Sequence, residues 1–240
     1  MADNMADITL ITATGDRPEA FRLCEKYMSR QTFAGAIQWL VVDDGLDPMP
    51  FSPIGKYIRR EPSAEDRQPT LALNILTVLP FVESDKILFI EDDDWYAPEY
   101  VEYMFHALGN AVIAGEGNAI YYNVKERKYF KHGNTGHASL CQTGLRFNED
   151  TRKLLQEVLY TQEKFIDILL WQKINGVKHL VNHEQPLCVG IKGMPGRKGI
   201  GTGHNPNERY IEDPELAYLK NLIGDDVKNY ERYFNGSRAH

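Results

Sequence analysis

The chain runs from four consecutive hydrophobic residues directly into four consecutive carboxylates, in the stretch ILFIEDDDWY at residues 87–96. A short apolar run of this kind predicts a buried strand. The carboxylates that follow it repel one another, and each loses hydration near a buried strand end. The fold must therefore bring positive charge or water to all four of them, which are Glu91, Asp92, Asp93 and Asp94.

Apolar strand patterns alternate with amphipathic helix patterns, which predicts an α/β fold with a mainly parallel sheet flanked by helices. We expect strands at residues 8–14, 37–45, 56–61, 86–94, 111–124, 128–133 and, as the last strand, 177–182. We expect helices at residues 18–31, 70–82, 98–108, 150–174 and 214–223, and the fourth of these patterns is long enough for two helices.

The composition is that of an ordinary globular chain, with 42% hydrophobic and 25% charged residues among 240. The net charge of −7 gives no overall electrostatic reason to bind nucleic acid. The three cysteines are widely spaced, which argues against a disulfide framework and favours a reducing compartment. The sequence shows neither a membrane span nor a secretory signal, and we therefore expect a cytoplasmic protein.

A second expected strand, IQWLVVDDG at residues 37–45, also ends in carboxylates, Asp43 and Asp44. Ligands of open parallel sheets bind outside the carboxyl ends of the strands, so both acidic clusters are expected at one edge. Carboxylate oxygens suit Mg²⁺ or Mn²⁺, which take phosphate oxygens as further ligands. The pattern favours a metal-bridged nucleotide, and the alternative is a solvated acidic turn before the helix that starts at Pro98.

Three stretches resemble family 2 type glycosyltransferases with the GT-A fold when they are taken in this order and spacing. TATGDRPEAFRLCEKYMSRQT is similar to the first strand–helix unit of that family, and VVDDG is similar to its second strand. ILFIEDDDWYAPEYVE is similar to its DxD strand. The resemblance covers residues 8–108, with a weaker match at residues 136–182.

The resemblance implies a domain organisation. A GT-A, Rossmann-like α/β domain would occupy residues 1–189, with a nucleotide-binding half at 8–94 and an acceptor half at 95–189. Residues 190–240 would add a Gly-rich lid loop and a C-terminal helix.

The resemblance also implies a metal site for Mn²⁺ or Mg²⁺. Glu91 and Asp93 hold the two acidic positions of the DxD pattern, and Asp94 follows them. Asp92 serves instead if the register shifts by one residue. Some GT-A enzymes use a C-terminal histidine as an additional ligand, and His204 is the residue that would fit this role here.

The nucleotide would be bound at the ends of the same strands. The residues expected to bind it are Thr12, Arg17, Asp43, Asp44 and Asp92. The chain departs from the family at Leu73–Asn74, where Arg-Asn is common, and Arg67 is the residue that would supply the missing positive charge.

The reaction implied is transfer of a sugar, hexosyltransferase-like, from a nucleotide-sugar donor to a hydroxyl acceptor, with a UDP-sugar as the favoured donor. An inverting enzyme needs a carboxylate that takes the acceptor proton. The family places it at the head of a late helix, where FIDILLWQKINGVK puts Asp167. Glu163 lies four residues earlier and is expected on the same helical face. The alternative for both residues is a solvated helix acid.

The segment GIKGMPGRKGIGTGHNP at residues 190–206 is rich in glycine but lacks the spacing of a phosphate-binding P-loop. We expect a mobile lid in which Lys192, Arg197 and Lys198 close over the diphosphate, and the alternative is a disordered surface loop. The small and polar stretch GHASLCQTG at residues 136–144 is expected to line the acceptor side.

The acceptor is left open: a glycan, a protein, a lipid-linked sugar or a modified nucleic-acid base. Two other functions remain as alternatives. A nucleotidyltransferase also binds a nucleotide at a sheet edge, but it would carry a Gly-rich basic loop after the first strand, where this chain has only GDRP. A non-catalytic module that binds a nucleotide or a sugar is the second alternative.

Overall fold

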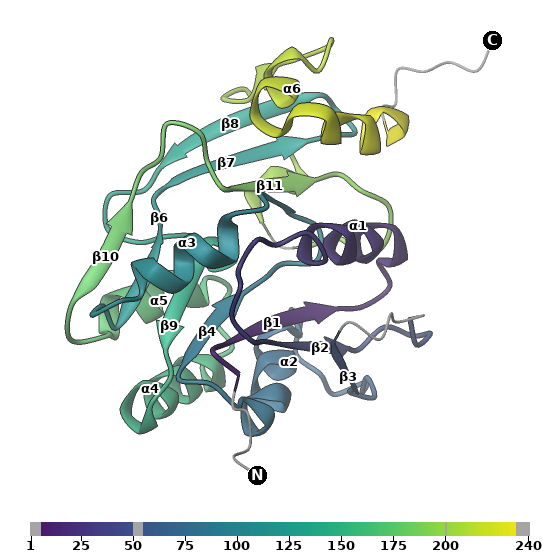
Figure 1. Ribbon diagram of the computed structural model, residues 1–240. Helices are drawn as coiled ribbons and strands as arrows, with labels where there is room; N and C mark the ends of the chain where they lie inside the picture. The colour runs from purple at the N-terminus through teal and green to yellow at the C-terminus, as the bar shows by residue number, and fades with distance from the viewer. Residues whose placement is uncertain (1–5, 50–54, 200, 234–240) are drawn as a thin grey trace.

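Two β-sheets organise the computed structural model, which describes residues 6–49, 55–199 and 201–233 (Figure 1). The larger sheet has seven strands in the order β10-β6-β9-β4-β1-β2-β3. Only β9 is antiparallel to its neighbours, so the predicted α/β fold with a mainly parallel sheet is confirmed. The strands are β1 Ile8–Thr14, β2 Ile37–Asp43, β3 Lys56–Arg59, β4 Lys86–Phe89, β6 Ile113–Glu116, β9 Thr143–Arg146 and β10 Lys178–Val181.

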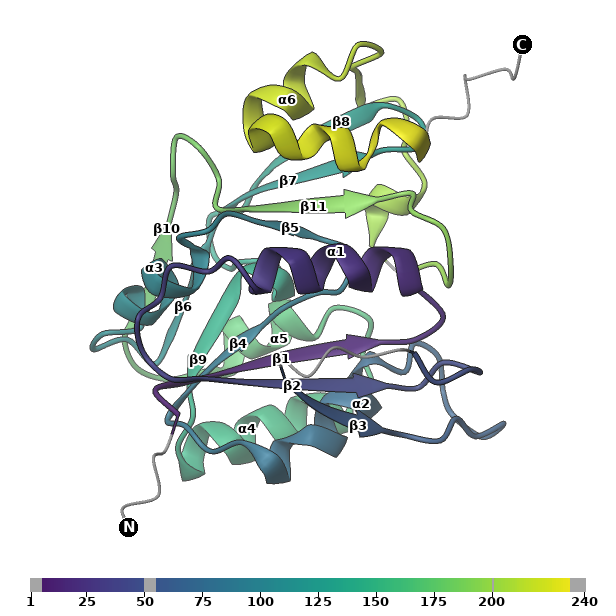
Figure 2. The same ribbon diagram turned by 45° about the vertical axis from the view of Figure 1, so that its right-hand side comes forward.

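Helices cover both faces of this sheet (Figure 2). Because side chains alternate along a strand, Leu10 packs into the hydrophobic core on one face and Ile11 into the core on the other. The first core includes residues of α1 Pro18–Met28 and α3 Tyr100–Ala107. The second includes residues of α2 Leu71–Val78, α4 Glu149–Tyr160 and α5 Ile166–Lys173. Within the described ranges, no helix has both the length and the apolar character needed to cross a bilayer.

The smaller sheet has five strands in the order β12-β8-β7-β11-β5. These strands are β5 Trp95–Tyr96, β7 Asn118–Asn123, β8 Lys128–Gly133, β11 Cys188–Lys192 and β12 Ile211–Glu212. Helix α1 lies between the two sheets and contacts β5, and α6 Ala217–Ile223 covers the smaller sheet from outside (Figures 1 and 2). The chain that follows β11 returns to the carboxyl end of β1, where the Arg197 backbone N–H donates a hydrogen bond to the Asp16 carbonyl.

Two expectations about the second half of the chain are corrected, and a third point that was left open is decided. Residues 177–182 do not contain the last strand, because β11 and β12 follow β10. Residues 190–192 belong to β11, so the boundary expected at residue 190 falls inside a strand and the lid cannot begin there. The pattern at 150–174 forms two helices, with residues 161–165 in the connection between them. Residues 234–240 of the expected extension lie outside the described part of the chain.

Candidate active site

A cavity lies at the carboxyl ends of β1 and β4, where the sequence predicted a ligand site. Its lining comes from segments that are far apart in the chain. The lining residues on which the site depends are Thr14, Arg17, Asn74, Glu91, Asp92, Asp93, Tyr121, Ser139, Cys141, Phe165, Asp167, Lys192, Arg197 and His204. Ser139, Leu140 and Cys141 of the stretch 136–144 contribute to this lining, and its assignment to the acceptor side stays a prediction.

Lys192 supplies the positive charge that the acidic cluster requires. Its Nζ lies 2.8 Å from Asp94 Oδ1, 3.0 Å from Asp93 Oδ1 and 3.4 Å from Glu91 Oε2. The Lys192 side chain is only 4% exposed, and it belongs to β11. The expectation that Lys192 closes over a diphosphate as part of a lid is therefore wrong, because its ammonium group is buried among carboxylates.

Arg17 is the second cation of the cluster. Its Nη1 lies 2.7 Å from Asp92 Oδ1 and 3.2 Å from Asp93 Oδ2. Thr14 Oγ1 donates a hydrogen bond of 2.7 Å to the other oxygen of Asp92. Both oxygens of Asp92 are thus bonded within the protein, whereas Asp93 faces the cavity between Arg17 and Lys192.

The four carboxylates of this cluster differ in their acidity. Burial raises the pKa of Asp93, but Lys192, Arg17 and His204 together outweigh burial and lower this pKa to about 2. Burial raises the pKa of Glu91, Asp92 and Asp94, and for these three the neighbouring cations do not compensate. Asp93 is therefore the carboxylate that stays ionised over the widest pH range.

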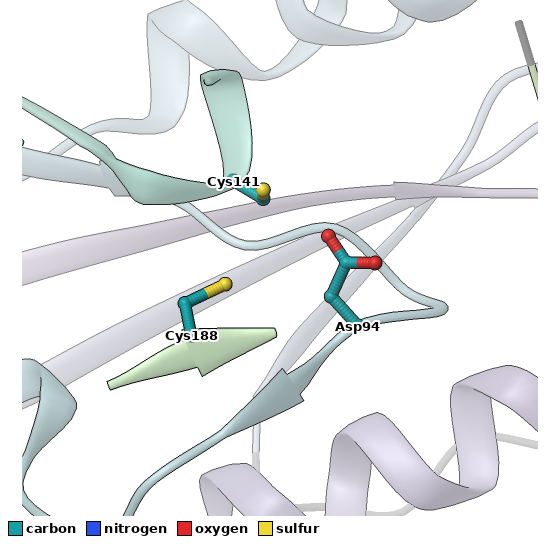
Figure 3. Close-up of side chains that lie close together, drawn as sticks. All are labelled: Asp94, Cys141 and Cys188. Carbon is teal, nitrogen blue, oxygen red and sulfur yellow. The ribbon is translucent and has the colours of Figure 1, made fainter. Parts of the chain in front are cut away.

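Asp94 lies behind the cavity and is absent from the described lining. Its Oδ1 accepts hydrogen bonds from the Ile191 backbone N–H, at 2.9 Å, and from Lys192. Its Oδ2 has no hydrogen-bond partner among the described residues. One oxygen of Asp94 lies within 4.8 Å of the sulfurs of Cys141 and Cys188 (Figure 3). A hydrogen bond with Cys188 and then burial raise the pKa of the Cys141 thiol, and burial raises the pKa of Cys188 to about 11 although the same hydrogen bond opposes this shift. The thiols are thus protonated, and Asp94 serves as a buried support for Lys192.

Asp93 and His204 have the geometry of two ligands to one cation. His204 Nε2 lies 3.8 Å from Asp93 Oδ2. Two ligand atoms that are each about 2.1 Å from the same ion lie roughly 3–4 Å apart. Burial and the charge of Lys192 lower the pKa of His204 to about 4, although Asp93 opposes this shift. The neutral imidazole therefore has a lone pair available at neutral pH.

Asp44 is buried and absent from the described cavity lining, and it joins two arginines, of which Arg197 lines the cavity. Its carboxylate pairs with Arg197 on one oxygen and with Arg60 Nη2 at 2.7 Å on the other. The Arg197 backbone N–H donates to the Asp16 carbonyl at 3.1 Å, and Arg17 Nε donates to the Arg197 carbonyl at 2.7 Å. The Gly-rich segment is thus bonded to the turn between β1 and α1.

Arg60 is the second partner of Asp44, and it was not identified from the sequence. Its Nε donates to Asn74 Oδ1 at 2.5 Å, and its Nη1 pairs with Asp66 at 2.7 Å. Arg67, from which positive charge was expected, is exposed, and its role stays a prediction. Arg60 could have been recognised from its place near the end of the strand pattern at 56–61. This pattern pairs with β2, which Asp44 follows directly.

Two residues expected to bind the nucleotide are buried behind the cavity. Thr12 Oγ1 accepts a hydrogen bond of 2.9 Å from Trp39 Nε1. Asp43 accepts hydrogen bonds from the Gly45 and Met49 backbone N–H groups, at 2.8 and 2.9 Å, and from the Tyr57 hydroxyl at 2.7 Å. These bonds tie the loop after β2 to β3.

We expect Asp43→Ala to destabilise the fold more than it affects ligand contacts. The change leaves three buried or half-buried donors without their acceptor, which costs roughly 2–5 kcal/mol of unfolding free energy. Asp47→Ala, on the exposed part of the same loop, is the control and should change stability by no more than about 0.5 kcal/mol. Urea unfolding measures both. A stable Asp43→Ala variant that fails to bind nucleotide would place Asp43 in the binding site instead.

Asp167 lies in the first turn of α5 and lines the cavity, whereas Glu163 does not share its helical face. Helix α4 ends at Tyr160, so Glu163 is exposed in the connection before α5, and the expected helical pairing is wrong. Burial raises the pKa of Asp167, although backbone N–H groups partly oppose this shift. Lys198 is exposed in the Gly-rich segment and is absent from the described lining.

Two aromatic residues, Tyr121 and Phe165, line the cavity together with Asp167, and neither was identified from the sequence. The hydroxyl groups of Tyr121 and Ser139 share a hydrogen bond of 2.7 Å. Phe165 is 42% exposed.

Comparison with known proteins identifies the fold. No known family model matches the chain, and no curated protein matches it. Among solved structures, S. aureus TarS 1–349 in complex with UDP is 10% identical with a TM-score of 0.50, and the match covers 77% of this chain and 60% of TarS 1–349. The mannosyltransferase PcManGT from Pyrobaculum calidifontis, in complex with GDP-Man and Mn²⁺, is 12% identical with a TM-score of 0.52, and the match covers 78% of this chain and 57% of that protein.

This chain thus spans about 60% of the TarS structure that it matches. The identities are too low to carry an activity from one protein to another, but the arrangement of elements is shared. The chain has the GT-A fold that glycosyltransferases such as PcManGT adopt.

Proposed function

We propose that this protein is a glycosyltransferase that moves a sugar from a nucleotide-sugar donor, with a UDP-sugar favoured, to a hydroxyl acceptor. One observation carries the proposal: Asp93, His204 and Asp167 line a single cavity at the strand ends of a GT-A sheet. The pair of Asp93 and His204 suits a cation, and Asp167 suits a base. Similar folds that hold UDP, or GDP-Man with Mn²⁺, support the donor class.

In this proposal, Asp93 Oδ2 and His204 Nε2 would hold Mn²⁺ or Mg²⁺, and phosphate oxygens of the donor would supply further ligands. The ion, when bound, stabilises the charge that develops on the diphosphate as the sugar leaves. Arg17 and Arg197 donate hydrogen bonds to the same phosphates from the opposite side, because guanidinium groups suit planar and bidentate contacts. Asp44 would accept a hydrogen bond from the ribose or the base in place of its bond to Arg197, which is then available to the phosphates.

Asp167 is the proposed base of an inverting transfer. Its carboxylate accepts the proton of the acceptor hydroxyl as that oxygen attacks the sugar. A pKa that burial raises makes Asp167 a stronger base than an exposed aspartate. The acceptor would enter over Tyr121, Ser139 and Phe165, which lie in the proposed acceptor half at residues 95–189.

The acceptor class stays open between glycans, proteins and modified nucleic-acid bases. A nucleotidyltransferase or a non-catalytic binding module remains the alternative, and neither has an observation that favours it over glycosyl transfer.

A thermal-shift screen of nucleotide sugars tests the proposal. UDP-sugars and GDP-sugars are added with Mn²⁺, with Mg²⁺ or with EDTA, and the melting temperature is measured. A donor at 100 times its Kd should stabilise the fold by about 2.7 kcal/mol, and EDTA should remove most of this effect. A protein whose melting temperature no nucleotide sugar raises, with either metal, would contradict the proposed function.

A further inference from the structure

The acidic cluster already contains a cation that belongs to the protein. Lys192 Nζ lies within 3.4 Å of oxygens from Glu91, Asp93 and Asp94, and it is bonded to all three. The carboxylate oxygens of these three residues come within 4.8 Å of one another, which is close enough to share one ion. The ammonium group thus lies where such an ion would bind.

The contacts leave few oxygens free for a divalent ion. Both oxygens of Asp92 are bonded to Thr14 and Arg17. Asp94 lies beside two thiols and is absent from the cavity lining (Figure 3). On the cavity side, Lys192 holds Glu91 through Oε2. Asp93 Oδ2, which also lies 3.2 Å from Arg17 Nη1, and His204 Nε2 at 3.8 Å from it are then the pair of protein ligands.

A site with two protein ligands holds a divalent ion weakly, because affinity rises with the number and charge of the ligands. The buried ammonium of Lys192 also repels a second cation at short range. Donor phosphates would add ligands and negative charge on the open side. Metal and donor should therefore bind together, and each should raise the affinity of the other by the same factor.

We propose that Lys192 is a positioning residue that keeps free divalent ions out of the acidic cluster and makes metal binding conditional on the donor. This inference rests on the proposed function for the identity of the donor. Lys192 holds Glu91, Asp93 and Asp94 in place, and it leaves one oxygen of Asp93 for the ion that arrives with the diphosphate.

The test measures Mn²⁺ binding by electron paramagnetic resonance, in which free Mn²⁺ gives a signal that bound Mn²⁺ loses. In the unaltered protein, UDP should tighten the Kd for Mn²⁺ at least tenfold. Lys192→Met frees three carboxylates, so its Kd for Mn²⁺ without nucleotide should be at least tenfold tighter than that of the unaltered protein. Adding UDP should then lower the Kd of Lys192→Met for Mn²⁺ by a smaller factor than it does in the unaltered protein. Lys153→Met removes an exposed lysine of α4 and should behave like the unaltered protein.

Lys192→Gln provides a second variant, since it keeps a polar side chain in case Lys192→Met does not fold. A gain in Mn²⁺ affinity without nucleotide, in either folded variant, supports the inference. No gain in folded variants overturns it. If the unaltered protein binds UDP but has the same Mn²⁺ affinity with and without it, the inference is overturned without any variant.

The two proposals fail separately. A protein that binds no nucleotide sugar contradicts the proposed function, while the measurements without nucleotide still decide the role of Lys192. Conversely, a protein that binds UDP and Mn²⁺ while its Lys192 variants gain no Mn²⁺ affinity retains the proposed function and loses this inference.

Discussion

Asp93→Asn is expected to abolish metal-dependent nucleotide binding in a protein that still folds. The amide keeps the volume of the carboxylate but loses the charge that a divalent ion needs. Each cation beside Asp93 keeps another partner, since Lys192 is also bonded to Asp94 and Arg17 to Asp92. Isothermal titration with UDP, in Mn²⁺ and then in EDTA, measures the effect. UDP affinity that is indifferent both to EDTA and to Asp93→Asn would contradict the metal assignment.

The same change has a predicted cost in stability. The folded-state pKa of Asp93, about 2, lies below its ordinary value of 3.8. A depressed pKa stabilises the fold above the ordinary pKa, and this contribution is lost as the pH falls through the folded-state value. At neutral pH, Asp93→Asn should therefore lower the unfolding free energy by about 2 kcal/mol. The difference between the variant and the unaltered protein should shrink between about pH 4 and pH 2.

Asp167→Asn is expected to lower the rate of transfer by a factor of about 10²–10⁴ and to leave donor affinity unchanged. The amide cannot accept a proton, while Asp93, His204 and Asp44 remain in place to bind the donor. The loss should appear in kcat and not in the KM for the donor, because the interaction exists only in the transition state. Steady-state kinetics with a donor and an identified acceptor measure both constants.

The pH profile adds a second readout for Asp167. Since burial raises its pKa, activity should fall as the pH drops through a value above that of an exposed aspartate, and Asp167→Asn should lack this acidic limb. Glu157→Gln, on the exposed face of α4, is the control.

If Glu163→Gln proves more damaging than Asp167→Asn, the base is misassigned. A product that retains the anomeric configuration of the donor would contradict an inverting mechanism.

The fold was predictable from the sequence where the signal is local. The strand patterns that run into Asp43 and into Glu91 are apolar, and each is followed at once by acids. Both acidic clusters are expected at one sheet edge, because parallel strands have their carboxyl ends on the same side. Asp93 could be singled out in this way, whereas Asp167 was expected only from the resemblance to family 2 type glycosyltransferases.

The partners of the acidic cluster were not predictable, because they depend on contacts between distant segments. Lys192 follows Asp94 by 98 residues, and it reaches Asp94 because β11 pairs with β5 and β7. Glycines on either side of Lys192 suggested a mobile loop. Arg60 was overlooked because the register between β2 and β3 brings it to Asp44, and the sequence pattern at 56–61 does not give this register.

Glu163 shows a different limit of sequence reasoning. The apolar pattern of residues 150–174 continues through the break between α4 and α5, so spacing alone places Glu163 and Asp167 on one face. In the structure, Gln162 has a left-handed backbone with φ of 50°, which ends the helix before Glu163. A non-glycine residue in this conformation gives no sequence signal, so the break could not be located.

Donor hydrolysis followed by product analysis tests glycosyl transfer most directly. The protein is incubated with a panel of UDP-sugars and GDP-sugars in Mn²⁺, and the nucleotide products are separated by chromatography. We predict that at least one donor slowly releases a nucleoside diphosphate and free sugar. This release should be lost in EDTA and in the Asp93→Asn variant. Release of a nucleoside monophosphate or of pyrophosphate, or tight nucleotide binding without turnover of any donor, would contradict this prediction.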